Sequence, residues 1–287
     1  MIKIATPFLL TLTFGVASFG VAPFGVAQAS TLPLLGAAQD FSVLAASTIT
    51  NTGATVLVGD LGVWPGTAIT GSGSFSLTGA IHVSDMVALN AHNSGIAAFT
   101  ALENKTPTTN LSGQDLAAQT LHPGVYHFDS SAQLSGTLTL DAQHDPNALF
   151  IFQVNSSLIT ATSSAVNVIN AGTGTGIFWQ IGSSATLGGG TAFAGNILAN
   201  QSITLDTGAS IFGGRALALN AAVTMNQNAI YSRCDTACND YGSNGYSGVS
   251  AVPEPSTALM SGFGLLLLLV MTKLRPRQRT GTKTKLF

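Results

Sequence analysis

The chain has 287 residues, of which 46% are hydrophobic and only 8% are charged, and its formal net charge is −2. Six of the ten basic residues lie between positions 273 and 285, and the other four are scattered. Outside this C-terminal tail the chain lacks the clustered Lys and Arg side chains that phosphate recognition needs, which excludes nucleic-acid binding by the body of the protein.

The first 29 residues have the pattern of a secretory signal peptide. Lys3 precedes a long uncharged apolar stretch, and Ala27-Gln28-Ala29 fits the small-x-small rule for a cleavage site. A permanent N-terminal membrane anchor is the alternative, but Pro7 and Pro23 count against it. We predict that residues 1–29 are removed and that the mature chain starts at Ser30.

Short strands dominate residues 36–231. Polar and apolar residues alternate there, which predicts strands with one inward and one outward face. A sandwich or an up-and-down barrel could use such strands, but no Asn-Gly hairpin turn occurs in this region and small and β-branched residues continue through the bends. A β-solenoid is therefore the predicted architecture, although a strict repeat length is missing. The clearest strand segments are 41–45, 55–59, 74–78, 136–140, 202–205 and 222–225.

Residues 84–102 break this alternation. Apolar residues recur at spacings of three and four from Val87 to Leu102, and Pro107 follows. Ser84 occupies the expected N-cap position and Asp85 the first turn. The pattern predicts one long amphipathic helix that buries its apolar stripe against the side of the solenoid.

Cys234 and Cys238 follow the solenoid domain, which we place at residues 30–233. In an exported protein a local disulfide is the first expectation and a pair of free thiols is the alternative. Residues 234–251 are rich in Gly, Ser, Asn and Tyr, and this composition predicts a flexible spacer.

Residues 252–287 resemble a PEP-CTERM sorting signal, because Pro253-Glu254-Pro255 precedes an apolar run at 258–271 and a basic tail. The resemblance implies processing by an exosortase-type peptidase, transient membrane contact through 258–271, and delivery to the cell surface or an extracellular polysaccharide matrix. An ordinary single-span tail anchor is the alternative. Loss of both ends would leave three basic residues against eleven acidic ones, a formal charge of −8.

The acidic residues and histidines do not form a convincing catalytic or metal site. Most carboxylates lie beside Gly, Pro or Asn, where Asp commonly stabilises turns. Asp141, His144 and Asp145 come nearest to a site, and we interpret them as a tight turn. His122 and His127 lack a third ligand nearby. We expect no enzymatic activity, no metal and no cofactor.

Several segments resemble the ice-binding proteins of the DUF3494 type. The matching strings include FSVLAASTITNTG (41–53), GDLGVWPGTAITG (59–71), LHPGVY (121–126), FWQIGSSATLG (178–188) and FAGNILA (193–199), and they occur in the order expected of the family. The resemblance implies an irregular right-handed β-solenoid with a long helix packed alongside, and coils that do not all stack in chain order. It also implies that one flat face binds ice, and we expect a monomer.

In some members of this family the ice-binding face carries a Thr-Ala/Gly-x-Thr/Asn motif. Such threonines are also common at turns and edges of any solenoid, because Thr has high β-propensity. The resemblance predicts an exported protein that adsorbs to ice, and the alternative is a matrix or adhesion module that binds exopolysaccharide or the cell surface. The candidate ice contacts are Thr52 with Thr55, Thr67 with Thr70, Thr207 with Ser210, and the weaker Thr186 and Thr191.

Overall fold

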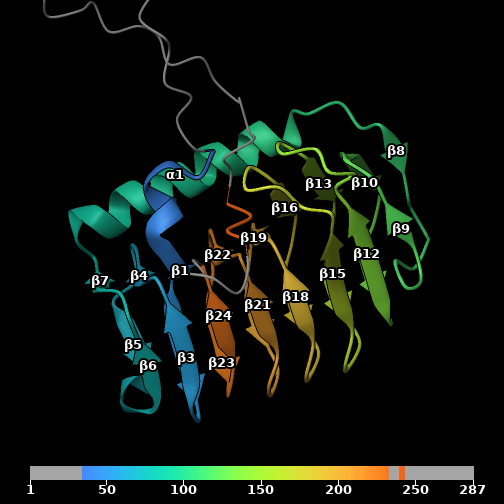
Figure 1. The fold of residues 1–287 in the computed structure, drawn as a ribbon. Coiled ribbons are helices and arrows are strands. Elements are labelled where there is room, and N and C mark those ends of the chain that lie inside the picture. Colours follow the sequence, from blue (N-terminus) through green and yellow to red (C-terminus); the bar gives the residue numbers. More distant parts are fainter. Residues whose placement is uncertain (1–33, 233–238, 243–287) are drawn as a thin grey trace, which may run out of the picture. The chain divides into compact units, whose positions relative to one another are not determined.

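The structure is a computed structural model that describes residues 34–232 and 239–242. These residues form a β-solenoid in which successive coils add strands to three parallel sheets, which we call A, B and C (Figure 1). The predicted architecture is therefore confirmed. The six predicted strand segments are all strands, with boundaries that agree to within one residue.

Strands that are neighbours within a sheet are never consecutive along the chain. In spatial order, sheet A contains β7 (Ile81–Val83), β4 (Asp60–Val63), β1 (Phe41–Ala45), β22 (Ala216–Ala218), β19 (Asn196–Ala199), β16 (Gly176–Ile181), β13 (Leu149–Val154), β10 (Gly124–Phe128) and β8 (Thr109–Asn110). Sheet B contains β11 (Ala132–Leu134), β14 (Leu158–Thr160), β17 (Ala185–Leu187), β20 (Ile203–Leu205), β23 (Val223–Asn226), β2 (Thr48–Thr52) and β5 (Ala68–Thr70). Sheet C contains β6 (Phe75–Leu77), β3 (Thr55–Val58), β24 (Ala229–Tyr231), β21 (Ser210–Phe212), β18 (Ala192–Ala194), β15 (Ala165–Ile169), β12 (Thr137–Asp141) and β9 (Thr120–Leu121). The helices are η1 (Gly36–Asp40), η2 (Ser72–Ser74) and α1 (Met86–Glu103).

The coils do not stack in chain order, as the family resemblance implied. Strand β1 lies between β4 and β22, so that Val43 pairs with Leu61 on one side and with Ala216 on the other. Helix α1 makes this order possible because its 18 residues span about 27 Å and carry the chain along sheet A, from β7 toward the far end of the sheet (Figure 1).

Apolar and polar residues alternate along the strands, so that the apolar side chains point into the solenoid and the polar ones point out. In β20, Ile203 and Leu205 are buried, whereas Thr204 between them points outward and is half-buried. The ring of Trp179 stacks on Phe152 with a centroid distance of 3.8 Å, and its Nε1 donates to the carbonyl oxygen of Ala194 at 3.1 Å. The core therefore meets the hydrogen-bonding need of its largest side chain.

Helix α1 packs on the outer side of sheet A, where Ala91, Ala98 and Leu102 contact the apolar side chains of several strands. The N-cap is Asp85, whose carboxylate accepts from the amide of Ala88 at 2.8 Å, so the prediction that Ser84 caps the helix is wrong by one residue. Ser84 instead has φ of 50° in the preceding turn. Gly95 allows close packing, because a Cβ there would lie 3.0 Å from the side chain of Leu219.

A second set of contacts on the outer side of sheet A ties the two ends of the described chain together. Arg215 is fully buried and binds the carboxylate of Asp240 through two nitrogens, at 2.9 and 3.1 Å. Its Nε also donates to the carbonyl oxygen of Gln39 at 2.8 Å. These bonds satisfy a cation that would otherwise be costly to bury.

The sheets, α1 and both hydrophobic clusters all fall within Ser30–Ala251, which forms one compact unit. This unit therefore contains all the described contacts that hold the solenoid together. Within residues 34–232 and 239–242, no helix is both long and apolar enough to cross a membrane.

Candidate functional site

The outward side of sheet B carries a row of threonines in register. Thr70, Thr50, Thr224, Thr204 and Thr186 are paired from strand to strand across β5, β2, β23, β20 and β17. Adjacent strands are about 4.8 Å apart, so the five side chains form a straight array of about 19 Å. We call this row the threonine ladder. Beyond Thr186 the row continues with Ile159 and Gln133.

Alternation explains why these threonines point outward. Each of Thr50, Thr186, Thr204 and Thr224 follows a buried Ile, Ala or Val, so burial of that apolar neighbour turns the hydroxyl to the surface. Branching at Cβ restricts each side chain to few rotamers. Among the described residues, these four hydroxyls have no protein hydrogen-bond partner. They are free to bond to a ligand or to water.

A second row of small side chains runs beside the ladder, two residues before each of its threonines. Thr48 pairs with Ala68. Further along, the hydroxyls of Ser184 and Ser202 lie 3.0 Å apart. Ala222 follows the same register, because its carbonyl oxygen accepts from the amide of Ile203 next to Ser202. Over the five strands of the ladder, the outer surface of sheet B therefore carries only short side chains of similar length.

The ladder contains no ionisable residue, and a carboxylate with a perturbed pKa lies beyond its Thr186 end, beside Gln133. Asp115 forms an isolated bridge with Gln133. Burial alone would raise the pKa of Asp115, but hydrogen bonds from Ser135 and from the amide of Ala117 outweigh it, and the pKa lies below its ordinary value. The neutral array is thus bounded at this end by a carboxylate that stays ionised near neutral pH.

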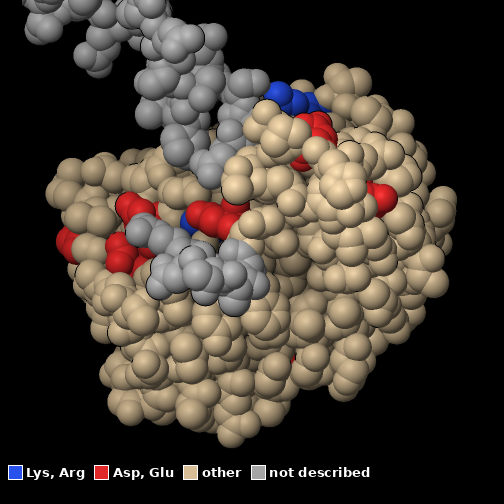
Figure 2. All heavy atoms as spheres, viewed as in Figure 1, with Lys and Arg blue, Asp and Glu red and all other residues tan. Residues whose placement is uncertain are grey.

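Sheet C has a different outer surface, although it too has few charges. Figure 2 shows that the charged side chains of the visible face gather in its upper part and leave the lower part, over the sheet C strands, almost free of them. The absence of charge therefore does not distinguish the sheets. Sheet C also has small outward residues in register, namely Ala229, Ser210, Ala192 and Ala165. It has no row of threonines like that of sheet B, and its other outward residues include exposed Val56, Ile169 and Phe212.

The structure places four of the candidate ice contacts at sheet B. Thr186 and Thr70 belong to the ladder itself. Thr52 is exposed at the end of β2, where it pairs with Asn226, and Thr67 is exposed just before β5. These four residues share one side of the solenoid.

The motif at Thr207 and Ser210 crosses the corner between sheets B and C. Thr207 is exposed in the turn after β20, and its hydroxyl accepts from the side-chain amide of Asn226 at 2.7 Å. Ser210 is the first residue of β21 in sheet C, and its hydroxyl donates to the carbonyl oxygen of Thr191 at 3.3 Å. The two residues therefore lie on different faces.

Thr55 and Thr191 require correction, because both point into the interior. Thr55 is only 1% exposed and donates to the side chain of Asn51 at 2.6 Å. Thr191 is fully buried and lies 2.9 Å from the hydroxyl of Thr160. Thr55 opens β3 in phase with buried Leu57, so alternation turns it inward. Neither residue can contact a surface ligand, and Thr55→Tyr would test folding instead of binding.

The motif search missed Thr48, Thr50, Thr204 and Thr224, which form much of the outer surface of sheet B. None of them occurs in a Thr-Ala/Gly-x-Thr/Asn string, because the residue after each threonine is neither Ala nor Gly. The signal that could have found Thr204 and Thr224 is a triplet with one threonine between two apolar residues, as in Ile203-Thr204-Leu205 and Val223-Thr224-Met225.

A family model described as Ice-binding-like matches residues 43–231. The chain belongs to the ice-binding-like family. An ice-binding protein of Nostoc sp. (strain HG1) is 46% identical over 253 residues, which cover 88% of this chain and 91% of the relative.

Two solved structures of ice-binding proteins resemble the ice-binding-like solenoid. The protein of the Antarctic ascomycete Antarctomyces psychrotrophicus has a TM-score of 0.67 and 37% identity, covering 71% of this chain and 100% of its own. A protein from an Arctic yeast, whose structure is described as the basis of its antifreeze activity, has a TM-score of 0.65 and 28% identity, covering 72% and 96%. Both likenesses support the β-solenoid fold.

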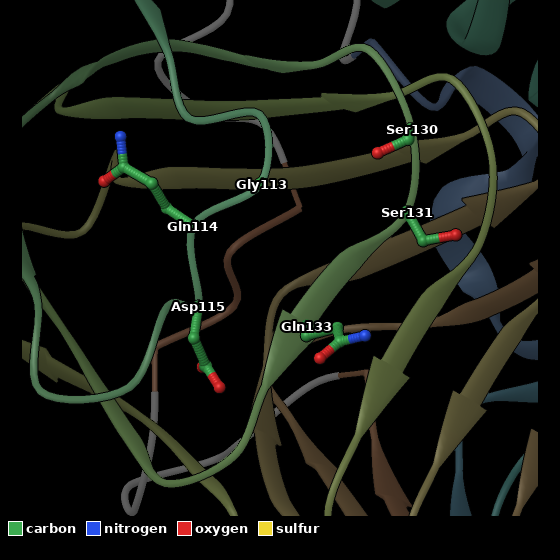
Figure 3. Close-up of a pocket in the computed structure, with 6 residues that line it drawn as sticks. All are labelled: Gly113, Gln114, Asp115, Ser130, Ser131 and Gln133. Carbon is green, nitrogen blue, oxygen red and sulfur yellow. The ribbon is translucent and has the colours of Figure 1, made fainter.

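The ice-binding-like chain also has a polar pocket of about 330 Å³, near the Gln133 end of sheet B. Gly113, Gln114 and Asp115 line one side of it, and Ser130, Ser131 and Gln133 line the other. Figure 3 shows that Gln114 and Ser131 extend in opposite directions, away from the space between the two segments. The pocket lacks a convergent set of functional groups, so we do not regard it as the site.

The alternative catalytic and metal candidates occupy structural positions. Asp141 and Asp145 accept from the amides of Gln143 and Asn147, two residues further on, at 2.9 Å each, which confirms the predicted turn. His127 contacts Asp129 at 3.0 Å. Among residues 34–232 and 239–242, no three His, Cys, Asp or Glu side chains are placed to hold a metal ion.

Several predictions concern residues outside those that the structure describes. They include the signal peptide at 1–29, Cys234 and Cys238, and the sorting signal with its apolar run at 258–271. These assignments remain predictions from the sequence.

Proposed function

We propose that this protein binds ice through the outer surface of sheet B, with the threonine ladder at its centre. The observation that carries the proposal is the register of Thr70, Thr50, Thr224, Thr204 and Thr186 across five neighbouring strands. Membership of the ice-binding-like family and the names of the similar proteins indicate that the ligand is ice.

The ladder combines the two features that a surface needs to hold water in an ice-like arrangement. Each hydroxyl can donate one hydrogen bond and accept two, and each methyl group excludes and orders the neighbouring water. Stacked strands fix the spacing of these groups, and Cβ branching limits their rotamers. Little conformational entropy is lost on adsorption, so many weak contacts can add up to stable binding.

Binding of this kind involves no turnover and no cofactor. The expected results are shaped ice crystals and inhibition of ice recrystallisation. The alternative of a matrix or adhesion module gains no support from the relatives named above, all of which are ice-binding proteins.

We further propose that the protein works outside the cell. The support is the signal-peptide pattern at 1–29 and the likeness of Pro253-Glu254-Pro255 and the 258–271 run to a PEP-CTERM signal. An exosortase-type peptidase would process the tail after transient contact of 258–271 with the membrane. Mass spectrometry of the secreted protein should find Ser30 at the mature N-terminus, and should find an unprocessed tail in a strain that lacks the peptidase.

The function is tested with purified Ser30–Ala251 in ice-shaping and recrystallisation assays. We expect activity in the unsubstituted protein and its loss in Thr224→Tyr, because a bulky ring would hold the surface of sheet B away from the ice. Asn167→Tyr is the matched control, since Asn167 is an exposed outward residue in the middle of a sheet C strand. An inactive unsubstituted protein would refute ice binding, whereas full activity of Thr224→Tyr would refute the choice of face.

A further inference from the structure

Among residues 34–232 and 239–242, nothing covers the apolar interior of the solenoid at one end. Strands β7, β5 and β6 are the last strands of sheets A, B and C at this end, which is on the left in Figure 1. Ile81 and Val83 pair with Leu61 and Val63 of the next coil, which are fully buried. Ile81 and Val83 themselves are 48% and 40% exposed. They are core positions that have no further coil to cover them within the described residues.

The uncovered surface involves all three sheets. Ile69 of β5 and Phe75 and Leu77 of β6 pack against the same core and are only partly buried. Each of the three strands also has an open edge. Just after β7, the amide of Ser84 donates to the carbonyl oxygen of Val63 in β4. Amides alternate in direction along a strand, so those of Ile81 and Val83 point away from β4, toward the free edge. We call this surface, with its three strand edges, the open end.

The opposite end of the solenoid is closed. Leu111, Leu116 and Leu121 are at most 9% exposed there. The chain between Leu111 and Leu121 crosses this end and presents polar residues such as Gln114 and Asp115 to solvent. Terminal coils of a solenoid normally need a polar outer face for solubility. Only the closed end meets that requirement.

The chain itself shows which partner fits such an end. The coil of β1, β2 and β3 pairs in register with the coil of β22, β23 and β24, although the two are far apart in sequence. Coils of this solenoid therefore recognise each other without a covalent connection between neighbours. A second copy can offer three strand edges at the spacing of the open end, together with a matching apolar centre.

We propose that the open end binds the open end of a second copy, which forms a two-fold symmetric dimer. Contact between like ends is isologous and closes on itself. Head-to-tail stacking would require the closed end as a partner and would continue into a filament. The sequence led us to expect a monomer instead. The sequence alone does not show which coil lies at the end of the solenoid.

The dimer is tested with Ser30–Ala251 by sedimentation velocity over a range of micromolar concentrations. We expect the mass of two chains, and the mass of one chain for Ile81→Lys, because a second copy would bury the added charge. Ile159→Lys is the matched control. Ile159 is an isoleucine of similar exposure, 45%, on the outer surface of sheet B, so its substitution should leave the dimer intact. A single-chain mass for the unsubstituted protein at every concentration would overturn the proposal, as would equal dissociation by both variants.

Hydrogen exchange of the unsubstituted protein gives a readout that does not depend on the folding of the variants. The amides of Ile81 and Val83 should be protected at high concentration and should exchange faster on dilution. Exchange in β9, at the closed end, should not change with concentration. If exchange in β7 is equally independent of concentration, the open end is not an interface.

Discussion

Sheets B and C are built from the same coils and follow the same inward pattern, but their outward side chains differ. Sheet B presents a row of five threonines in register, whereas sheet C has no such row and exposes Val56, Ile169 and Phe212 among its outward residues. The interior thus determines the fold on both sides, and the outward positions are free to carry a function. The face with uniform outward residues is the one we assign to ice.

The largest expected effect comes from truncation of the shared interior. Leu205→Ala in sheet B and Ile211→Ala in sheet C should each lower the free energy of unfolding by about 2–5 kcal/mol, because both side chains are buried. Chemical denaturation measures the loss. Ice activity per folded molecule should survive in both variants. A much smaller loss on one side would show that the two sheets do not contribute equally to the core.

The next effect separates the two parts of the threonine side chain. Thr204→Val keeps the shape and the methyl group but replaces the hydroxyl by a second methyl, and Thr204→Ser keeps the hydroxyl but removes the methyl. A lost hydrogen bond of about 0.5–1.5 kcal/mol should lower ice affinity about two- to tenfold in the valine variant. Recrystallisation assays at graded concentrations can rank the pair. Unchanged activity in both would mean that the centre of the ladder is not in contact with ice.

A smaller effect should come from lengthening the ladder. Ile159 continues the row beyond Thr186, so Ile159→Thr would add a sixth threonine in register. We expect a modest gain in recrystallisation inhibition. Ile169→Thr on sheet C is the control, since it makes the same change at an exposed isoleucine outside the row. Equal gains in both variants would show that threonine content matters more than position.

The smallest effect is expected from pH, because the ladder contains no ionisable group. A hydrogen bond from the Ser112 side chain is the main cause that lowers the pKa of Asp129 below its ordinary value. A hydrogen bond from the Asn170 side chain does the same for the pKa of Asp141. Such groups stabilise the fold above their unfolded pKa of about 3.9, and this contribution is lost as the pH falls toward the lowered folded pKa. Ice activity should therefore be constant between about pH 5 and pH 8, and thermal stability should decline only below about pH 4. A change of activity near neutral pH would implicate a titrating group in the ice-binding surface.

Local patterns were enough to predict six of the strands, the helix and the class of fold. Alternation also contains the information that Thr55 is buried, since Thr55 and Leu57 lie on the same side of β3, but the motif search gave priority to the Thr-x-x-Thr spacing. Thr52 is the last residue of β2 and Thr55 is the first residue of β3, so a corner of the solenoid lies between them and the two threonines point in different directions.

The ladder as a whole could not be predicted because it depends on the register between coils. Stacked residues are separated by different numbers of positions: 27 from Leu149 to Gly176, 18 from Phe178 to Asn196 and 19 from Ile197 to Ala216, so equal steps along the sequence do not lead to stacked positions. The pairing of Thr50 with Thr224 further requires the first and last coils to meet. Such non-local pairing is invisible to any window of sequence. The exposure of Ile81 and Val83 was missed for the same reason, because their apolar pattern is that of a buried strand.

The bonds of Arg215 with Asp240 and Gln39 bring both ends of the described chain to one place on the outer side of sheet A. Sheet B forms another side of the solenoid. The two ends of the described chain therefore lie together, on a side of the solenoid other than the one that carries the threonine ladder. A crystal docked on the ladder would leave both of these ends clear.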